Sequence, residues 1–530
     1  MPLREVPADL ATAFEMPDWR SKVAWPLAHA ESEKLLRSQL RAFVRFLANI
    51  EDQDLRNIAV LAGHGIMVRG RAIILTAAAI AAPQKAGDHF VGQEPELLYL
   101  QGEWPEDKEI PERPFSAFPD SRVRYPWLRR VARIASWTPW WRTPTTVLFP
   151  DATAITHNAM LRDYAAFNGV SLGYSHDFLL LEKARKYEGV PRTDLKPISE
   201  KIRHLLLEGF SITEPVLGRA QFLLDQLISR YLASASKDLS SLRQLKRLPE
   251  AIWAGTGGGY ASRAIGLEVI RRGGTVRRFD HGGSNGLIDC PESFALIELF
   301  PSTEYVAATC QAAETIIESG GPKLLAPLAE TKIIGHHGDP TYKKVPIFRK
   351  LHKGSKLRVV YAPSALIGFR HPFHNLLQDT VYLNWQMDLA ENLNKLPIDL
   401  ICKPHPEGLM EGKRHPLEGI ASTNYGKFED LIEDTDIFIF DYPPSTTFWE
   451  SLCTDRRVVL IDLGISGFSK SVRPLVNARC HTLEAEWDSD NRPFVNQDAL
   501  ADSILGKSKN YDPMPIRRLL VNEDQDNQLR

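Results

Sequence analysis

The chain has 530 residues, too many for one hydrophobic core, and its length predicts two or three domains. Hydrophobic residues make up 43% and charged residues 25%, and 64 Lys and Arg against 66 Asp and Glu leave a net charge of -2. This balance is typical of a soluble globular protein and excludes a general nucleic-acid binder, whose affinity depends on excess positive charge.

The cysteines indicate a reducing, cytoplasmic compartment. They are widely spaced, odd in number and without a CxxC pair, so they predict neither a disulfide framework nor a structural zinc site. The N-terminus has no hydrophobic signal core, and the longest apolar run, 72–82, is shorter than the roughly 20 residues of a spanning helix. We expect a protein that does not cross a membrane by itself.

The first half of the chain predicts helices and short buried strands. Residues 1–55 have a helical pattern, which places on one face Leu35, Leu36, Leu40, Phe43, Val44 and Leu47. Apolar runs then predict strands at 57–63, 96–102, 145–151, 251–259 and 275–283. Helical patterns at 197–210 and 220–235 lie between them, and the alternation predicts a parallel α/β sheet.

The second half alternates more clearly. The order is strand 356–364, helix 379–396, strand 398–407, helix 427–435, strand 436–442, helix 445–454 and strand 456–464. This pattern predicts a doubly wound βαβ domain, whose functional residues should lie at the carboxyl ends of the strands.

The predicted organisation has four parts. They are an N-terminal helical segment (1–55), a first Rossmann-like domain (56–345), a second Rossmann-like domain (346–508) and a C-terminal tail (509–530). The charged tail is expected either to be disordered or to pack back over the other domain.

A His-Pro motif, KPHPE at 403–407, follows one of the predicted strands. Pro404 and Pro406 have restricted φ angles, so His405 has little conformational entropy left to lose on binding a ligand. Such an imidazole suits a phosphate. The alternative is that the His-Pro pair only marks a loop.

A second motif, DYPPSTT, ends at the start of a predicted helix. It brings Ser445, Thr446 and Thr447 to the helix N-terminus, where hydroxyl and N–H groups favour an anion. By itself it is most often a plain helix start. Both motifs in this order on consecutive βαβ units are much less common by chance.

Together the motifs resemble those in the donor-binding domains of GT-B enzymes that use cytidine nucleotides, such as bacterial sialyltransferases, Kdo transferases and CDP-glycerol glycerophosphotransferases. The resemblance covers mainly the last third of the chain and implies an α/β GT-B fold of two Rossmann-like domains facing across a cleft. It implies that His405 contacts the nucleotide phosphate, that Ser445 and Thr446 hold its oxygens, and that Glu450 lies near the ribose or the domain core. Lys403, Pro404, Glu407 and Thr447 complete the expected donor contacts in this domain.

The first domain contains a glycine-rich turn and an acidic candidate. Gly257 and Gly258 lie between a strand and a helix, where the backbone can approach a donor closely. A dinucleotide-cofactor site is the alternative, but GxGGG lacks the GxGxxG spacing. Asp280 and His281 occupy the position of the acidic-acidic-glycine motif of sialyltransferase-like enzymes, with His as the middle residue, and Asp-His-Gly-Gly resembles a signature of surface-polysaccharide transferases.

The resemblance implies transfer of Kdo or a related nonulosonic acid from a CMP-activated donor to a cell-surface glycan, in lipopolysaccharide or capsule. Loss of CMP passes through an oxocarbenium-like state, so the departing phosphate must be stabilised and a carboxylate is needed on the opposite face. Asp280 is the candidate base or nucleophile, and His281 and His405 complete the catalytic set. The alternative for Asp280 is a cap on the glycine loop.

No metal and no cofactor other than the CMP-sugar substrate are expected. The segment 488–493 is expected to be a surface turn, and the adjacent His336 and His337 are expected to point in different directions within a linker. By position only, Arg263, Ser284, Asn285 and Lys403 are available for the sugar carboxylate.

The remaining expectations concern partners. The Trp- and Arg-rich segment 122–142 suits a peripheral contact with the inner membrane, which fits a lipid-linked glycan acceptor. Ordinary packing is slightly favoured over this contact, and stacking on an acceptor sugar is a third option. Alternative functions are a CDP-polyol phosphotransferase of the teichoic type, a non-catalytic GT-B module that binds nucleotide sugars, and a UDP-dependent epimerase.

Overall fold

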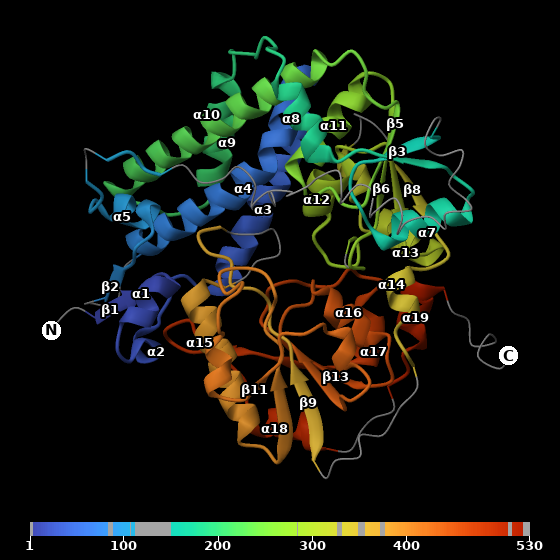
Figure 1. Ribbon diagram of the computed structural model, residues 1–530. Helices are drawn as coiled ribbons and strands as arrows, with labels where there is room; N and C mark the ends of the chain where they lie inside the picture. Colours follow the sequence, from blue (N-terminus) through green and yellow to red (C-terminus); the bar gives the residue numbers. More distant parts are fainter. Residues whose placement is uncertain are drawn as a thin grey trace.

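The computed structural model describes residues 4–82, 88–105, 108–111, 150–283, 285–325, 331–347, 356–370, 377–506 and 511–522. Two six-stranded sheets organise these residues, and every strand pair within them is parallel. Figure 1 shows the two sheets in separate halves of the molecule, one above the other. The class is therefore α/β, as the sequence predicts.

The N-terminal sheet has the order β4-β3-β5-β6-β7-β8. Its strands are β3 (Ala152–Ala154), β4 (Leu172–Tyr174), β5 (Ala251–Ala254), β6 (Thr275–Phe279), β7 (Glu304–Ala307) and β8 (Lys332–Gly335). The helical elements of this half are α7 (Ala159–Phe167), α8 (Asp177–Arg185), α9 (Lys196–Leu207), α10 (Val216–Arg243), α11 (Tyr260–Arg271), α12 (Pro291–Phe294), the π-helix η2 (Ala295–Leu299), α13 (Cys310–Glu318), η3 (Pro322–Leu325) and α14 (Pro340–Lys343).

The C-terminal sheet has the order β11-β10-β9-β12-β13-β14. Its strands are β9 (Leu357–Tyr361), β10 (Ile398–Cys402), β11 (Ser422–Thr423), β12 (Ile437–Phe440), β13 (Arg457–Asp462) and β14 (His481–Glu484). Around it lie α15 (Asp379–Asn394), η4 (Pro416–Gly419), η5 (Glu429–Leu431), α16 (Thr446–Leu452), α17 (Arg473–Arg479), the hairpin β15 (Glu486–Trp487) and β16 (Pro493–Phe494), and α18 (Gln497–Leu505). Since β8 ends at Gly335 and β9 begins at Leu357, the predicted boundary at 345/346 falls between the sheets. The hairpin encloses 488–493, which forms a turn as expected.

The N-terminal segment contacts both halves of the molecule. It contains β1 (Arg4–Pro7), α1 (Leu10–Glu15), α2 (Trp19–Lys22), α3 (His29–Ala48), α4 (Gln53–Ala81), β2 (Asp88–Val91) and α5 (Pro95–Gln101). Of the expected apolar face of α3, all but Leu35 are buried, and Leu35 is only partly buried. Residues before α3 instead contact the C-terminal half, where Arg20 pairs with Asp388 and Glu391 of α15.

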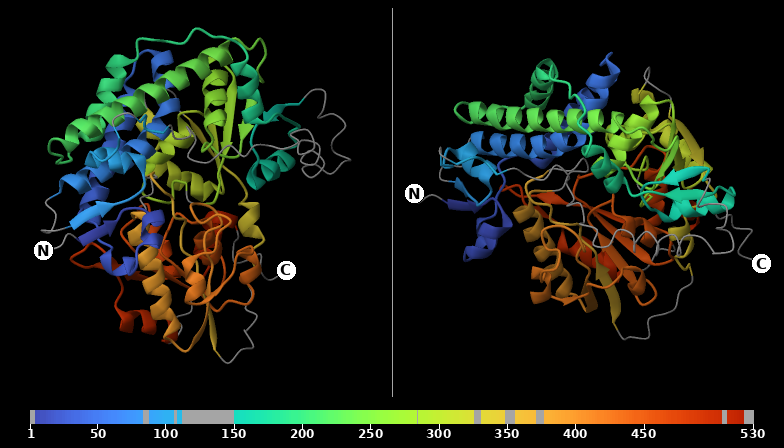
Figure 2. Two further views of the ribbon diagram at one scale, coloured as in Figure 1. Left: turned by 60° about the vertical axis from the view of Figure 1, so that its left-hand side comes forward. Right: turned by 45° about the horizontal axis from the view of Figure 1, so that its top comes forward.

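The strand expected at 57–63 is wrong, because this run belongs to α4. The helix is apolar on nearly all sides, so it carries no clear helical periodicity and resembles a buried strand. Its glycines allow close packing: a Cβ at Gly65 would lie 2.6 Å from Tyr231 of α10. Figure 2 shows α4 and α10 lying side by side. By length and composition α4 could cross a membrane, but 89% of its most apolar window is buried within the protein.

Two further expectations fail for local reasons. The strand expected at 96–102 is α5, which begins with Pro95 and ends before Gly102 at a φ of 83°. This pairing of an initial proline with a terminal glycine is a helix signature. The helix expected at 427–435 contains only the short 3₁₀ helix η5. The expected strand at 145–151 and the segment 122–142 lie wholly or mostly outside the described residues.

The C-terminal helix α19 (Met514–Val521) joins the two halves. Thr309 Oγ1 donates to the Leu519 carbonyl at 2.7 Å, and the Asp339 amide donates to that of Leu520 at 2.8 Å. Arg517 donates to the carbonyls of Val345 and Cys453, at 3.1 and 3.0 Å. Residues 511–522 therefore pack back over the N-terminal half, one of the two expected arrangements of the tail.

Candidate functional site

The Asp280 loop, residues 280–283, follows the carboxyl end of β6. Asp280 is 3% exposed, and its Oδ1 accepts hydrogen bonds from Tyr305 Oη at 2.9 Å, the His281 amide at 2.8 Å and Asn285 Nδ2 at 3.4 Å. Asn158, the N-cap of α7, donates to the Asp280 carbonyl at 2.6 Å. The carboxyl group is thus held by Tyr305 of β7, the His281 amide and Asn285, while Asn158 fixes the Asp280 backbone.

Burial sets the acidity of Asp280. It raises the pKa to about 7, and the nearby Asp339 carboxylate adds to the shift, although the hydrogen bonds from Tyr305, His281 and Asn285 oppose it. A carboxyl group with a pKa near neutrality can exchange a proton at physiological pH. The described geometry is therefore compatible with a general base.

The Asp280 loop meets the start of α16 in the other half. Gly282 has a φ of 78°, and a Cβ there would lie 2.6 Å from Thr446 Oγ1. Gly283 has a φ of 69°, and a Cβ there would lie 2.5 Å from the Tyr342 hydroxyl. Glycine is thus required for both the backbone conformation and the close approach. We call this contact of the Asp280 loop with Thr446 the junction.

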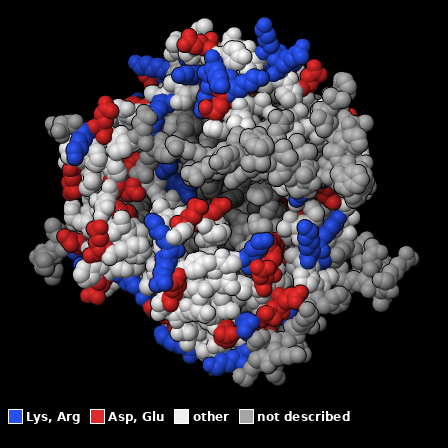
Figure 3. Space-filling model, in the orientation of Figure 1, with Lys and Arg blue, Asp and Glu red and all other residues white. Residues whose placement is uncertain are grey.

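The junction is open to solvent, since His281 and Thr446 are both exposed. Ser445 Oγ and Thr447 Oγ1 lie 2.7 Å apart beside Thr446. The first amides of a helix have no intrahelical partner, so polar donors gather here. Figure 3 shows the molecular face hollowed between the two halves, with acidic and basic side chains at its border.

Two more ionisable groups lie behind the junction. Glu450, on α16, is 4% exposed, and burial followed by the Glu429 and Asp339 carboxylates raises its pKa to about 8. The Tyr342 hydroxyl is buried without a hydrogen-bond partner among the described residues and interacts electrostatically with Asp339, Glu450 and Asp280. The Asp-Pro pair at 339–340 is a sequence signal for the start of a helix, and Asp339 is indeed the N-cap of α14. The sequence analysis missed it because it assigned the residues around His336 to a linker.

The His-Pro loop, residues 403–408, follows β10. The His405 ring is exposed and Nδ1 accepts from the Glu407 amide at 3.2 Å, while surrounding protein lowers its pKa through desolvation. Lys403 is buried, and its ammonium donates to the Pro404 carbonyl at 3.3 Å. Because β9 lies between β10 and β12, the strand ends that carry His405 and Thr446 are about 10 Å apart.

The glycine-rich turn at 257–258 forms hydrogen bonds within the protein. The Gly257 amide donates to both carboxylate oxygens of Glu298, at 2.9 and 2.8 Å. Arg263 is 2% exposed and donates to the carbonyls of Gly257 and Gly258, at 3.0 and 2.9 Å. The Gly257 amide and the Arg263 guanidinium, expected to be available to a ligand, therefore already have partners within the protein. Asn285 instead supports Asp280, and Ser284 lies outside the described residues.

The expectation that His336 and His337 point in different directions is wrong. Both Nε2 atoms lie 3.0 Å from Oδ2 of Asp163 on α7. Desolvation is the largest cause that lowers the pKa of both imidazoles, and Lys343 contributes in the same direction. The sequence analysis missed Asp163 as the partner of these histidines because it lies more than 170 residues earlier in the sequence.

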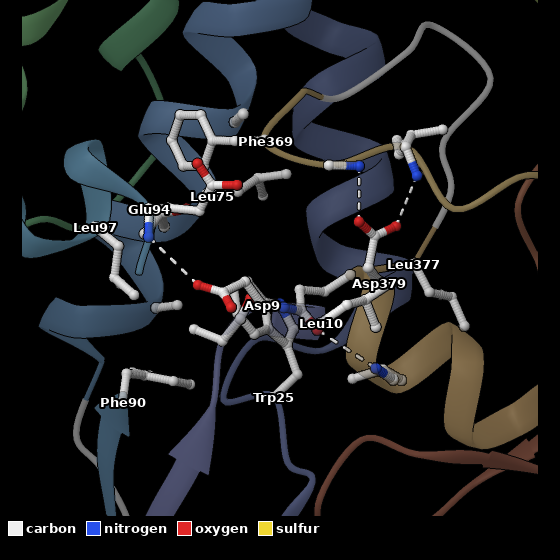
Figure 4. A pocket seen from close by; sticks show the side chains of 18 of the residues that line it. Asp9, Leu10, Trp25, Leu75, Phe90, Glu94, Leu97, Phe369, Leu377 and Asp379 are labelled. Atoms are coloured by element: carbon white, nitrogen blue, oxygen red, sulfur yellow. Dashed lines mark hydrogen bonds between the residues drawn. The ribbon is translucent and has the colours of Figure 1, made fainter. Parts of the chain in front are cut away.

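A cavity of about 490 Å³ lies beside the His-Pro loop, between the N-terminal segment and the C-terminal half. Leu409, Met410 and Lys413, which follow that loop, form part of its wall. Figure 4 shows aromatic and apolar side chains around the carboxyl groups of Asp9, Glu94 and Asp379. The volume is in the range of small-molecule sites. Sequence reasoning missed it because its walls come from segments remote from each other in the chain.

Comparison with protein-family models gives no match, and no curated protein matches the chain significantly.

Proposed function

We propose that the protein is a GT-B glycosyltransferase that moves Kdo or a related nonulosonic acid from its CMP-activated donor to a cell-surface glycan. The junction is the observation that carries the proposal. It joins the Asp280 loop of one parallel sheet to the Ser/Thr motif of the other, each at the carboxyl end of a strand. Open α/β sheets bind ligands at this edge.

In the proposed reaction, the bond between the anomeric carbon and the CMP phosphate breaks, and the departing phosphate takes the electron pair. His405 and the hydroxyls of Ser445, Thr446 and Thr447 stabilise its charge. Asp280 acts on the opposite face, where it either accepts the proton of the acceptor hydroxyl or attacks the anomeric carbon. Its pKa of about 7 favours the first role, because a general base works best near the operating pH.

The cavity beside the His-Pro loop provides room for a bound ligand. It adjoins the residues that follow His405, and its walls combine carboxyl groups with the aromatic rings of Trp25 and Phe90. Aromatic surfaces with a few polar groups suit sugar rings and bases alike. We therefore propose that the donor extends from the junction, along the His-Pro loop, toward this cavity.

The proposal is tested by CMP release from CMP-Kdo and CMP-nonulosonates in the presence of glycan acceptors. We expect Asp280→Asn to reduce turnover at least about 100-fold while CMP still binds, because general-base catalysis contributes about that much. Asp498→Asn, at an exposed position of α18, is the matched control and should retain turnover. CMP binding without turnover of any CMP-sugar by the wild-type protein would instead favour the non-catalytic module.

A further inference from the structure

Three potential metal ligands converge at the carboxyl end of β8. Asp163 comes from α7, and His336 and His337 follow the strand directly. Their ligating atoms, Asp163 Oδ2 and the two imidazole Nε2 atoms, all lie within 4.8 Å of one another. Each Nε2 is 3.0 Å from Oδ2.

These separations are close to those of a coordinated ion. Zinc binds imidazole nitrogen and carboxylate oxygen at about 2.0–2.2 Å, which puts neighbouring ligand atoms in a tetrahedral site about 3.4 Å apart. Each Nε2–Oδ2 separation would have to lengthen by only about 0.4 Å to match this geometry. Two imidazoles and one carboxylate are also the ligand set of zinc sites that keep a position for water.

The backbone holds both histidines in place. The His336 amide donates to the Ala307 carbonyl at 3.0 Å, and His337 forms an antiparallel bridge with Thr309. Gly338 then turns away at a φ of 111°, a conformation that favours glycine. The ligands thus lose little freedom on binding, which favours affinity.

The side chains enclose one side of the cluster and leave the other open. The His336 side chain is only 2% exposed, and its ring lies 5.1 Å from that of Tyr164. Phe167 covers His337, with 4.3 Å between ring centroids. Asp163 and His337 remain 34% and 32% exposed, so a fourth ligand can reach the ion from solvent.

We propose that Asp163, His336 and His337 bind one divalent transition-metal ion, with Zn²⁺ the best fit and one coordination position open to solvent. The ligand types also suit Co²⁺, Ni²⁺ and Fe²⁺, so selectivity among them depends on metal supply as well as geometry. The charge of Lys343, which acts on both imidazoles, opposes the cation, while that of Asp163 favours it. This inference does not depend on the proposed glycosyl transfer.

The test uses the untagged full-length chain, freed of metal by a chelator, so that no affinity tag supplies histidines. Calorimetric titration with Zn²⁺ and visible spectroscopy with Co²⁺ should both give one ion per chain. Asp163→Asn and His337→Ala should weaken binding at least about 10-fold. His204→Ala, which removes an exposed histidine of α9, should bind as the wild type does.

Folding is controlled separately for each variant by circular dichroism and by the melting temperature without metal. Zn²⁺ should raise the melting temperature of the wild type and His204→Ala, since it binds only the native site. Absence of stoichiometric binding to the wild type would overturn the proposal. So would binding that is equally strong in Asp163→Asn and His337→Ala, because the ion would then sit elsewhere.

Discussion

Asp280 and Glu450 are carboxyl groups that the fold removes from water, so their protonation is coupled to folding. Their pKa values are about 7 and about 8 in the native protein, well above those of exposed carboxyl groups. Above about pH 4, an unfolded chain loses protons that the native protein keeps. The unfolded state then binds fewer protons, and stability falls as pH rises.

We predict that the free energy of unfolding contributed by these groups decreases from about pH 4 to 7 for Asp280 and to 8 for Glu450. Each group contributes a slope of at most about 1.4 kcal/mol per pH unit. Denaturant unfolding at pH 5 and 8 measures this, and Asp280→Asn and Glu450→Gln should each flatten the dependence. Glu411→Gln, an exposed glutamate, is the control. Unchanged slopes in both buried variants would contradict the assignment.

Gly282 makes the close contact at the junction. The effect of this contact on stability can be separated from the effect of the Gly282 φ angle. Gly282→Ala should destabilise by about 1–2 kcal/mol for the left-handed backbone plus a further cost for the clash with Thr446. Gly273→Ala has a similar φ of 82°, but the described residues place nothing within 4 Å of the added Cβ, so it should show only the first effect.

Denaturant unfolding of both variants measures the difference. Adding Thr446→Ala should recover stability in the Gly282→Ala background only, because the substitution removes the opposing hydroxyl. Equal stability of Gly282→Ala and Gly273→Ala would show that the junction is not tightly packed.

Among the helices and strands, α4 is the one whose close packing should affect stability most. Gly65→Ala gains about 1 kcal/mol of helix propensity but puts a methyl group 2.6 Å from the Tyr231 ring. Overpacking a buried site costs about 1–3 kcal/mol, so we predict net destabilisation. Gly218→Ala, at an exposed position of α10, should be stabilising, since its nearest neighbour is the flexible end of Glu214. Thermal unfolding measures both, and a stabilised Gly65→Ala would contradict this packing.

The elements also show what sequence patterns can predict. In the C-terminal half β9, β10, β12 and β13 are short, mostly apolar and bounded by polar turns, so the sequence predicts all four. The run at 57–63 has the same composition but belongs to α4, because burial on every side removes the periodicity that distinguishes helix from strand. Local composition alone cannot separate these cases.

For the site, sequence reasoning found the loops but not their contacts. Asp280 was placed correctly at a strand end. Tyr305, which donates to its carboxyl group, and Asp339, whose charge raises its pKa, become its neighbours only through the fold. Gly257 and Arg263 were assigned to ligands because the sequence does not reveal Glu298, which takes the Gly257 amide.

At the scale of the whole molecule, α19 connects the two halves through buried hydrogen bonds. Arg517→Met should lower the free energy of unfolding by about 1–3 kcal/mol, because the buried carbonyls of Val345 and Cys453 lose their donor. Arg518→Met, at the exposed neighbouring position, should change it by no more than about 0.5 kcal/mol. Denaturant unfolding compares them, and equal effects would contradict the role of α19.

The proposed function is tested most directly by nucleotide selectivity. Melting temperatures are measured with CMP, CDP, UMP and UDP at equal concentrations, since a ligand that binds the native state raises apparent stability. The account predicts a selective rise with CMP that is lost in His405→Ala and kept in Glu411→Ala, an exposed substitution shortly after the same loop. A preference for CDP or UDP, or no response to any nucleotide, would contradict it.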